Sequence, residues 1–91
     1  MPQPRFGAAV RDFRTAKDLK LTWLAREAGV APSHLSHLER GERRPRPRSL
    51  LSITAACRRA GASADEMARL YELGVGDLVE PPAESRTEVE A

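Results

Sequence analysis

The sequence is poor in the residues that mark secreted, membrane-spanning or large-cored proteins. Among its 91 residues is a single cysteine, Cys57, so no internal disulfide can form and we expect a reducing, cytoplasmic location. No run approaches the ~18 consecutive apolar residues of a membrane span, and the N-terminal MPQPRF lacks the apolar stretch of a signal peptide. The only aromatic residues are Phe6, Phe13, Trp23 and Tyr71. We therefore expect one small domain that gains from a second copy or a partner.

The charge is small overall but unevenly placed along the chain. The formal net charge is +2, from 15 lysine and arginine and 13 aspartate and glutamate residues. Residues 80–91 carry four of the acidic residues and one arginine, which leaves 14 basic and 9 acidic residues in 1–79. Residues 1–79, the body of the chain, thus carry a net charge of +5, and residues 80–91, the tail, carry a net charge of −3. Adjacent prolines and like charges predict that residues 80–91 are disordered, so the domain is placed at residues 5–79.

A second concentration of charge lies within the body. Residues 40–48, RGERRPRPR, contain five arginines and one glutamate. Because two prolines interrupt any helix, we expect an exposed loop with a dense positive field. Such a loop either is simply solvated or binds an anion that relieves the repulsion between the arginines. Phosphate is the anion we expect, although the acidic tail is an alternative ligand for the loop.

Apolar residues recur at helical spacing and no segment alternates with a period of two, which predicts an all-α domain of five short helices. The first spans roughly residues 5–17, and the second starts near Leu21 and ends at Gly29. The third runs from Pro32 to Gly41, and the fourth begins after Pro47. A capping box at Ser63–Glu66 opens the fifth. The residues expected on the inward faces are Phe6, Ala9, Val10, Phe13, Ala16, Leu21, Leu24, Ala25, Ala28, Leu35, Leu38, Leu50, Ile53, Thr54, Cys57, Ala60, Met67, Leu70 and Tyr71.

Only three or four residues separate the second and third helices, which predicts the sharp crossing of a helix-turn-helix. At 100° per residue, Leu35 and Leu38 lie opposite a face formed by Ser33, Ser36 and His37. This outward face is polar and lacks acidic side chains. It suits a helix that enters the major groove of DNA, although an ordinary solvated face would have the same composition.

Residues 19–41, LKLTWLAREAGVAPSHLSHLERG, resemble the helix-turn-helix of the Cro/phage-repressor superfamily, the xenobiotic-response-element family of bacterial transcription regulators. The resemblance covers about residues 6–60. The matching positions are Leu24-Ala25, Gly29-Val30, Leu35-Ser36 and Glu39-Arg40-Gly41. It implies a compact, lambda-repressor-like domain that binds double-stranded DNA.

The resemblance also implies roles for matching residues. Pro32, Ser33 and His37 fall where such proteins touch base edges, and Arg14 is expected to form an ion pair with Glu39. The residues expected to contact phosphates are Lys20, Thr22, Ser36, Arg40, Arg43, Arg44 and Arg46. One departure matters: many members have a glutamine that contacts a phosphate at the position of Leu21, which cannot do so, and Lys20 or Thr22 is expected to substitute.

The remaining signals are weaker. His34 and His37 could form half of a metal site, but no further ligand lies nearby, so we expect no metal. No phosphate-binding glycine loop or activated nucleophile is present, and we expect neither a cofactor nor an enzyme. Trp23 lies opposite the buried stripe of its helix and either packs on the fifth helix or anchors a partner.

These features define two hypotheses. The first is a homodimeric regulator that binds an inverted repeat through the third helix, with the dimer contact on the fifth helix and the residues after it. The alternative is a protein-interaction adaptor, such as an antitoxin-like partner, on the same fold. The candidate partner contacts are Trp23, Leu73 and Leu78.

Overall fold

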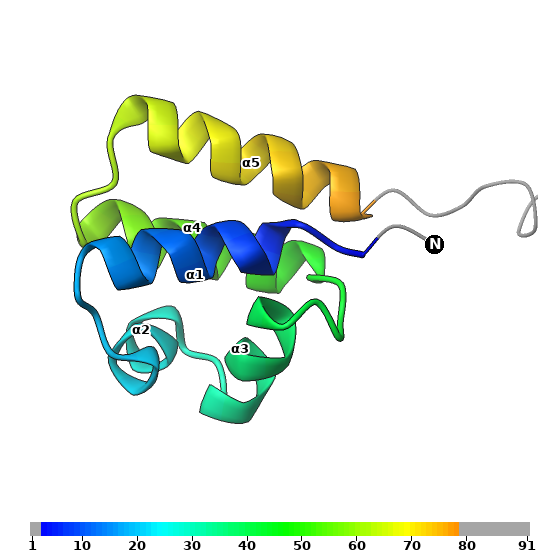
Figure 1. The fold of residues 1–91 in the computed structure, drawn as a ribbon, viewed down its shortest axis with the longest axis horizontal. Coiled ribbons are helices and arrows are strands. Elements are labelled where there is room, and N and C mark those ends of the chain that lie inside the picture. Colours follow the sequence, from blue (N-terminus) through cyan, green and yellow to red (C-terminus); the bar gives the residue numbers. More distant parts are fainter. Residues whose placement is uncertain (1–2, 79–91) are drawn as a thin grey trace, which may run out of the picture.

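The computed structural model describes residues 3–78, and these form five α-helices and no strand (Figure 1). They are α1 (Phe6–Ala16), α2 (Leu21–Ala28), α3 (Pro32–Glu39), α4 (Pro47–Arg59) and α5 (Ala64–Leu78). The all-α, five-helix prediction is confirmed. The acidic tail, residues 80–91, lies outside the described residues, as does Val79.

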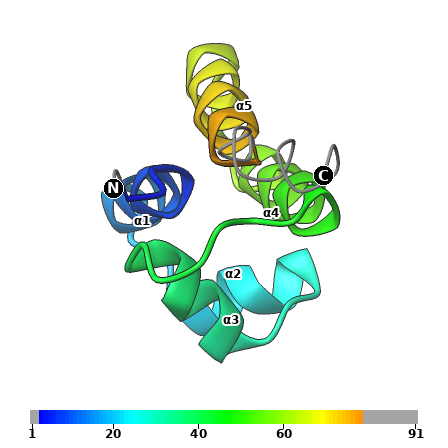
Figure 2. The ribbon, with the colours of Figure 1, turned by 90° about the vertical axis from the view of Figure 1, so that its right-hand side faces the viewer.

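The helices are arranged around α1 and α4. Viewed along the long axis, α5 lies on one side of these two helices and the α2–α3 pair on the other (Figure 2). Helix α1 contacts α3 and α5, and α4 contacts α2 and α5. Helices α2 and α3 also contact each other. This helix-turn-helix lies on one side of the molecule, and α5 lies on the opposite side (Figure 1).

The helix boundaries follow local signals in the sequence. Gly29 ends α2 in the left-handed conformation, with φ 72°, and the next N–H, that of Val30, donates to the Ala25 carbonyl at 3.0 Å. Pro32 and Pro47 each occupy the first turn of a helix, where the missing N–H costs nothing. Helix α4 therefore begins at Pro47 itself, one residue earlier than expected.

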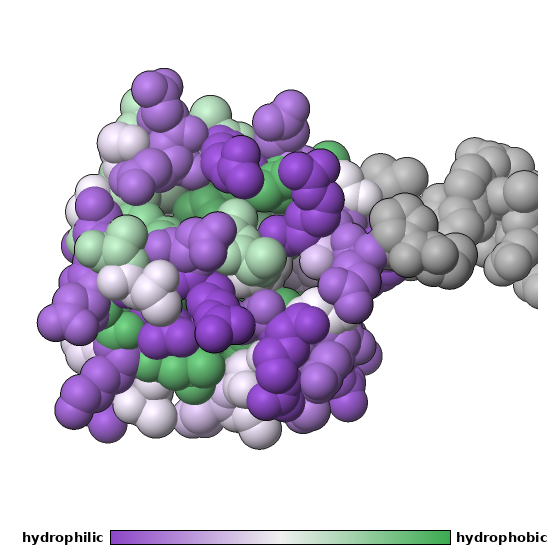
Figure 3. Space-filling view, viewed as in Figure 1, coloured by the Kyte–Doolittle hydropathy of each residue, from purple (hydrophilic) through white to green (hydrophobic). Residues whose placement is uncertain are grey.

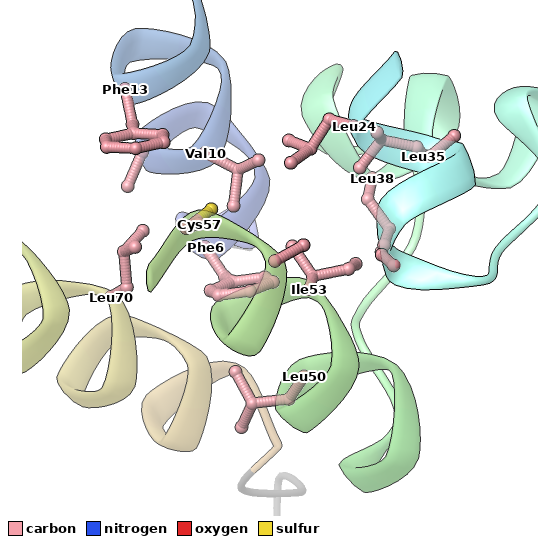
Figure 4. Close-up of a cluster of buried hydrophobic side chains, with 14 residues drawn as sticks. Phe6, Val10, Phe13, Leu24, Leu35, Leu38, Leu50, Ile53, Cys57 and Leu70 are labelled. Carbon is pink, nitrogen blue, oxygen red and sulfur yellow. The ribbon is translucent and has the colours of Figure 1, made fainter. Parts of the chain in front are cut away.

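The core is formed by side chains from all five helices (Figure 4). Helix α4 contributes Ile53 and Cys57, which meet Phe6 and Val10 of α1 in the centre of the molecule. The buried Thr54 hydroxyl is satisfied, because it donates to the Leu50 carbonyl at 2.8 Å. The buried apolar residues are Phe6, Ala9, Val10, Phe13, Leu24, Ala25, Ala28, Leu35, Leu38, Leu50, Ile53, Ala56, Cys57 and Leu70.

Two residues expected to face inward do not. Ala16 is exposed because α1 ends there, and Tyr71 is 40% exposed because it lies at the flank of the α5 stripe rather than at its centre. Leu21, Ala60 and Met67 are half-buried and pack against the edge of the core. No helix within residues 3–78 is both long and apolar enough to cross a membrane.

Glycine is required where α1 approaches the end of α3. A Cβ at Gly7 would overlap the carbonyl group of Leu38, so no other residue allows these two backbones to come so close. This contact places the first turn of α1 directly behind the C-terminal end of α3.

Candidate nucleic-acid interface

Helix α3 presents the outward face that the sequence predicts. Leu35 and Leu38 are essentially inaccessible to solvent and anchor the helix to the core. On the other side, Pro32 and Ser33 are exposed, and the side chain of His37 is 39% exposed. The three residues expected to read bases therefore lie on accessible surface. Ser36 is half-buried, between the two faces.

An ion pair fixes the C-terminal end of α3. Arg14 Nε and Nη2 donate to the two carboxylate oxygens of Glu39 at 2.8 and 2.9 Å, and Arg14 Nη1 donates to the Leu19 carbonyl at 2.9 Å. These are the two residues for which we expected a pair. The hydrogen bond to Glu39 raises the pKa of Arg14, with a smaller contribution from the Glu39 charge. Because the Glu39 side chain is only 4% exposed, this pair rigidly joins α1, the α1–α2 connection and α3.

A groove lies between α3 and the start of α4. Four of the lining side chains are arginines and none is acidic: the lining residues are His34, Arg43, Arg44, Arg46, Arg48 and Ser49. In Figure 3, strongly hydrophilic side chains gather over the end of α3 and its connection to α4. A concave surface with four guanidinium groups and no carboxylate attracts a polyanion. We call this surface the arginine groove.

The connection between α3 and α4 is held in place by contacts with α5 and with α3. Pro45 is buried, and Arg44 Nη1 donates to the main-chain carbonyl of Asp77 in α5 at 3.0 Å. On the α3 side, Ser49 Oγ lies 3.4 Å from His34 Nε2. Of the five donors of Arg44, at least one is thus used inside the protein, whereas Arg43 and Arg46 are exposed.

The other residues expected to contact phosphates lie outside the arginine groove. Lys20 is exposed and precedes α2, and Thr22 is exposed on its first turn. Arg40 is exposed as well, but its guanidinium is paired with Glu42, with Nε 3.1 Å from Oε2. The structure therefore gathers only Arg43, Arg44 and Arg46 of the expected phosphate contacts into one groove.

Sequence reasoning missed several residues of this region. Arg48 and His34 line the groove, and Arg48 was one of the five clustered arginines, so the composition of the loop was signal enough to include it. Glu42 was also missed. Its Oε1 lies 2.5 Å from His37 Nδ1, and the hydrogen bonds from His37 and Arg40 lower the pKa of Glu42. The turn at Gly41, with φ 75°, ends α3, and the Glu42 N–H donates to the His37 carbonyl at 3.0 Å, which brings the two residues together.

Of the three expected partner contacts, Trp23 is exposed and the two leucines are not. Leu73 and Leu78 are half-buried and pack against the core. Within the described part of the chain, the large apolar side chains that are exposed are Trp23 at 38%, Leu51 at 60%, Tyr71 at 40% and Val75 at 52%. Tyr71 and Val75 are four residues apart and so share one side of α5.

The cysteine and histidines form no metal centre within residues 3–78, where no three metal-ligating side chains come together. Cys57 is buried, and desolvation raises the pKa of its thiol to about 12, with smaller contributions from the charges of Glu39 and Glu66. The thiol is therefore protonated and unreactive at neutral pH, as suits a core residue.

Known proteins share the helix-turn-helix of this chain. A model of a family described as helix-turn-helix domain matches residues 5–70. The chain is similar to two crystal structures of the clp gene regulator ClgR from Corynebacterium glutamicum. One is 34% identical with a TM-score of 0.64, over 87% of this chain and 97% of the other. The second is 32% identical with a TM-score of 0.62, over 94% and 86%. A search of curated proteins found no match.

Proposed function

The chain belongs to the helix-turn-helix domain family, and we propose that it is a transcription regulator that binds double-stranded DNA and catalyses no reaction. The observation that carries this proposal is the arginine groove beside the exposed polar face of α3. The similarity to the regulator ClgR supports the same function. No residue lining the groove is acidic, which is the condition for holding a phosphate backbone next to the helix that reads the bases.

In the proposed mechanism, arginines capture the duplex before any base is read. Arg43, Arg46 and Arg48 contact phosphates and release counterions, and the remaining donors of Arg44 assist them. Lys20, Thr22, Ser36 and Arg40 extend the phosphate contacts. Helix α3 then enters the major groove, where Ser33 and His37 reach base edges and Pro32 provides an apolar contact. The Arg14–Glu39 pair holds the helix at a fixed angle during this step.

We also propose that the regulator acts as a homodimer on an inverted repeat. A single α3 reads too few base pairs for high specificity, and half-site centres about 34 Å apart would place two copies on one face of DNA. Tyr71 and Val75 on α5, with Leu51 on the adjacent α4, provide exposed apolar surface for the contact. We propose this surface for the dimer contact in place of Leu73 and Leu78, whose side chains already pack against the core.

One observation favours the second function, a protein-interaction adaptor. Trp23 is 38% exposed on α2, and tryptophan is one of the residues enriched at the centres of protein interfaces. In this alternative Trp23 anchors a protein partner, and DNA binding is weak or absent.

Binding to random-sequence duplex DNA at increasing salt concentration tests the primary proposal. We expect measurable binding at ~50 mM salt, with affinity that falls steeply as salt rises. Replacing both Arg43 and Arg46 by alanine should reduce the slope of log affinity against log salt by about 2, because each phosphate contact contributes about 0.9. Both residues are exposed, so the fold should be retained.

Arg69→Ala is the matched control. Arg69 is an exposed arginine on α5, on the side of the molecule opposite the α2–α3 pair, so its loss should leave the slope unchanged. Undetectable binding at ~50 mM salt, or equal effects at Arg69 and in the groove, would contradict the phosphate-binding role of the arginine groove. Capture of a protein partner that is lost in Trp23→Ala would then favour the adaptor.

A further inference from the structure

We propose that Glu42 determines which base His37 recognises, by fixing which ring nitrogen of His37 carries the proton. The inference rests on the proposed function, since it requires α3 to lie in the major groove. Glu42 is thus a positioning residue that acts through its neighbour and touches no base itself.

The geometry begins with one short hydrogen bond. His37 Nδ1 and Glu42 Oε1 are 2.5 Å apart, so a proton must lie between them. His37 and Arg40 both lower the pKa of Glu42, and Glu42 is therefore an ionised carboxylate, which can only accept. The proton consequently belongs to Nδ1 of the imidazole, which donates it to Glu42.

Arg40 holds the carboxylate in place. Its Nε lies 3.1 Å from Glu42 Oε2, and its Nη2 lies 3.3 Å from Oε1. Arg40 Nη2 lies 3.4 Å from His37 Nδ1, farther away than Glu42 Oε1, so Oε1 is the nearer partner of this ring nitrogen. Arg40 and His37 thus bind the two oxygens of one carboxylate, which makes Glu42 the acceptor nearest to the imidazole.

The tautomer determines what His37 can recognise. If the His37 ring carries one proton, a proton on Nδ1 leaves Nε2 with a lone pair, whereas a ring with two protons would present Nε2 as a donor. Within residues 3–78, no hydrogen bond engages Nε2 of His37, so that it is available to a base. In the major groove the donors are the amino groups of cytosine and adenine, whereas guanine presents only acceptors. The protein should thus favour cytosine or adenine at this position and disfavour guanine.

Glu42→Gln reverses this arrangement with little change in shape. The glutamine amide can donate to Nδ1, which moves the imidazole proton to Nε2 and makes it a donor. The variant should then favour guanine, whose N7 and O6 accept. The competing explanation is that Glu42 merely repels phosphates. In that case Glu42→Gln tightens binding to every duplex by one common factor and changes no base preference.

Selection of bound sites from a random DNA pool separates these outcomes. The base position read by His37 is the one whose preference disappears in His37→Ala. At that position Glu42→Gln should change the ratio of guanine to cytosine by about tenfold, the discrimination of one good base contact. Glu72→Gln removes the same charge from an exposed site on α5 and should leave every preference unchanged.

A second measurement needs no DNA. Nitrogen-15 NMR of the free protein should find His37 protonated at Nδ1 in the wild type and at Nε2 in Glu42→Gln, with His34 as the internal reference. The proposal is overturned, while DNA binding stands, by any of three results. These are a common gain in affinity without a change in base preference, a His37 tautomer that is the same in both proteins, and a wild-type His37 ring protonated on both nitrogens. Failure of the wild type to bind any duplex overturns the proposed function, and the base-reading role of Glu42 with it.

Discussion

At the scale of single residues, two buried positions determine how α1 meets α3. Gly7 allows the backbones to touch at Leu38, and the adjacent Glu39 accepts two hydrogen bonds from Arg14. Both contacts lie behind the outward face of α3. The residues that orient the proposed reading helix are therefore distinct from those that would touch DNA.

Gly7→Ala should destabilise the protein by about 3 kcal/mol, because the new methyl group would overlap backbone that cannot move aside. Gly76→Ala is the matched control, since a Cβ there meets nothing within 4 Å. That variant should raise the free energy of unfolding by about 0.5–1 kcal/mol, the helix-interior difference between alanine and glycine. Denaturant unfolding measures both. Equal effects at the two glycines would show that α1 and α3 are not in the close contact described.

At the scale of helices, local capping explains most of the boundaries. The capping box of α5 is an example: Glu66 N–H donates to Ser63 Oγ at 3.1 Å, and Ser63 N–H donates to Glu66 Oε1 at 2.8 Å. The hydrogen bond from the Ser63 backbone lowers the pKa of Glu66, and the charge of Lys17 adds to this. The motif predicted from four residues of sequence is present because its partners are all local.

Ser63→Ala should cost about 1 kcal/mol of stability at neutral pH. Glu66→Gln tests the pH dependence. Because the pKa of Glu66 is lowered in the folded state, its contribution is complete above its ordinary pKa of about 4.3 and is lost as the pH falls through the lower folded value. The difference in unfolding free energy between wild type and Glu66→Gln should therefore shrink from pH 6 to pH 3. A difference independent of pH would contradict the capping role.

The sequence predicts well those features that depend on neighbouring residues, and less well those that depend on distant ones. The helix spans were predictable because Gly29, Pro32 and Ser63 act on their own neighbours, and the polar face of α3 followed from its period. The Arg44–Asp77 contact was not predictable, since it depends on the path of the connection between α3 and α4. The His37–Glu42 contact is local and was missed because it depends on the geometry of the turn at Gly41. The exposure of Tyr71 was also missed, because the period alone does not show where a neighbouring helix stops covering a stripe.

At the scale of the whole molecule, Asp77 closes the fold. Its carboxylate accepts hydrogen bonds from the N–H groups of Arg5 at 3.1 Å and Phe6 at 2.7 Å, more than seventy residues away. These N–H groups begin α1 and lack partners within the helix, so Asp77 caps α1 from the far end of the domain. The main-chain carbonyl of Asp77 accepts a hydrogen bond from Arg44 Nη1, which links the arginine groove to α5.

Asp77→Ala should destabilise the protein by about 2–3 kcal/mol, because it leaves the buried N–H of Phe6 without its charged acceptor. Glu72→Ala, an exposed acidic residue on the same helix, should change stability by less than about 0.5 kcal/mol. Thermal unfolding measures the difference, and amide exchange at Phe6 should quicken only in Asp77→Ala. If the two variants were equally stable, the hydrogen bonds from the start of α1 to Asp77 would not contribute to stability.

The closure by Asp77 also means that the order of the helices along the chain can be changed. Since Arg5 and Asp77 are hydrogen-bonded, a short linker could join the end of α5 to the start of α1. New termini would fall in the exposed turn at Gly61, which has open space around it. Such a circular permutant would run from α5 through α1 to α4 with the same packing. It would also turn a hydrogen bond between residues 72 apart in the sequence into a local one, which favours faster folding.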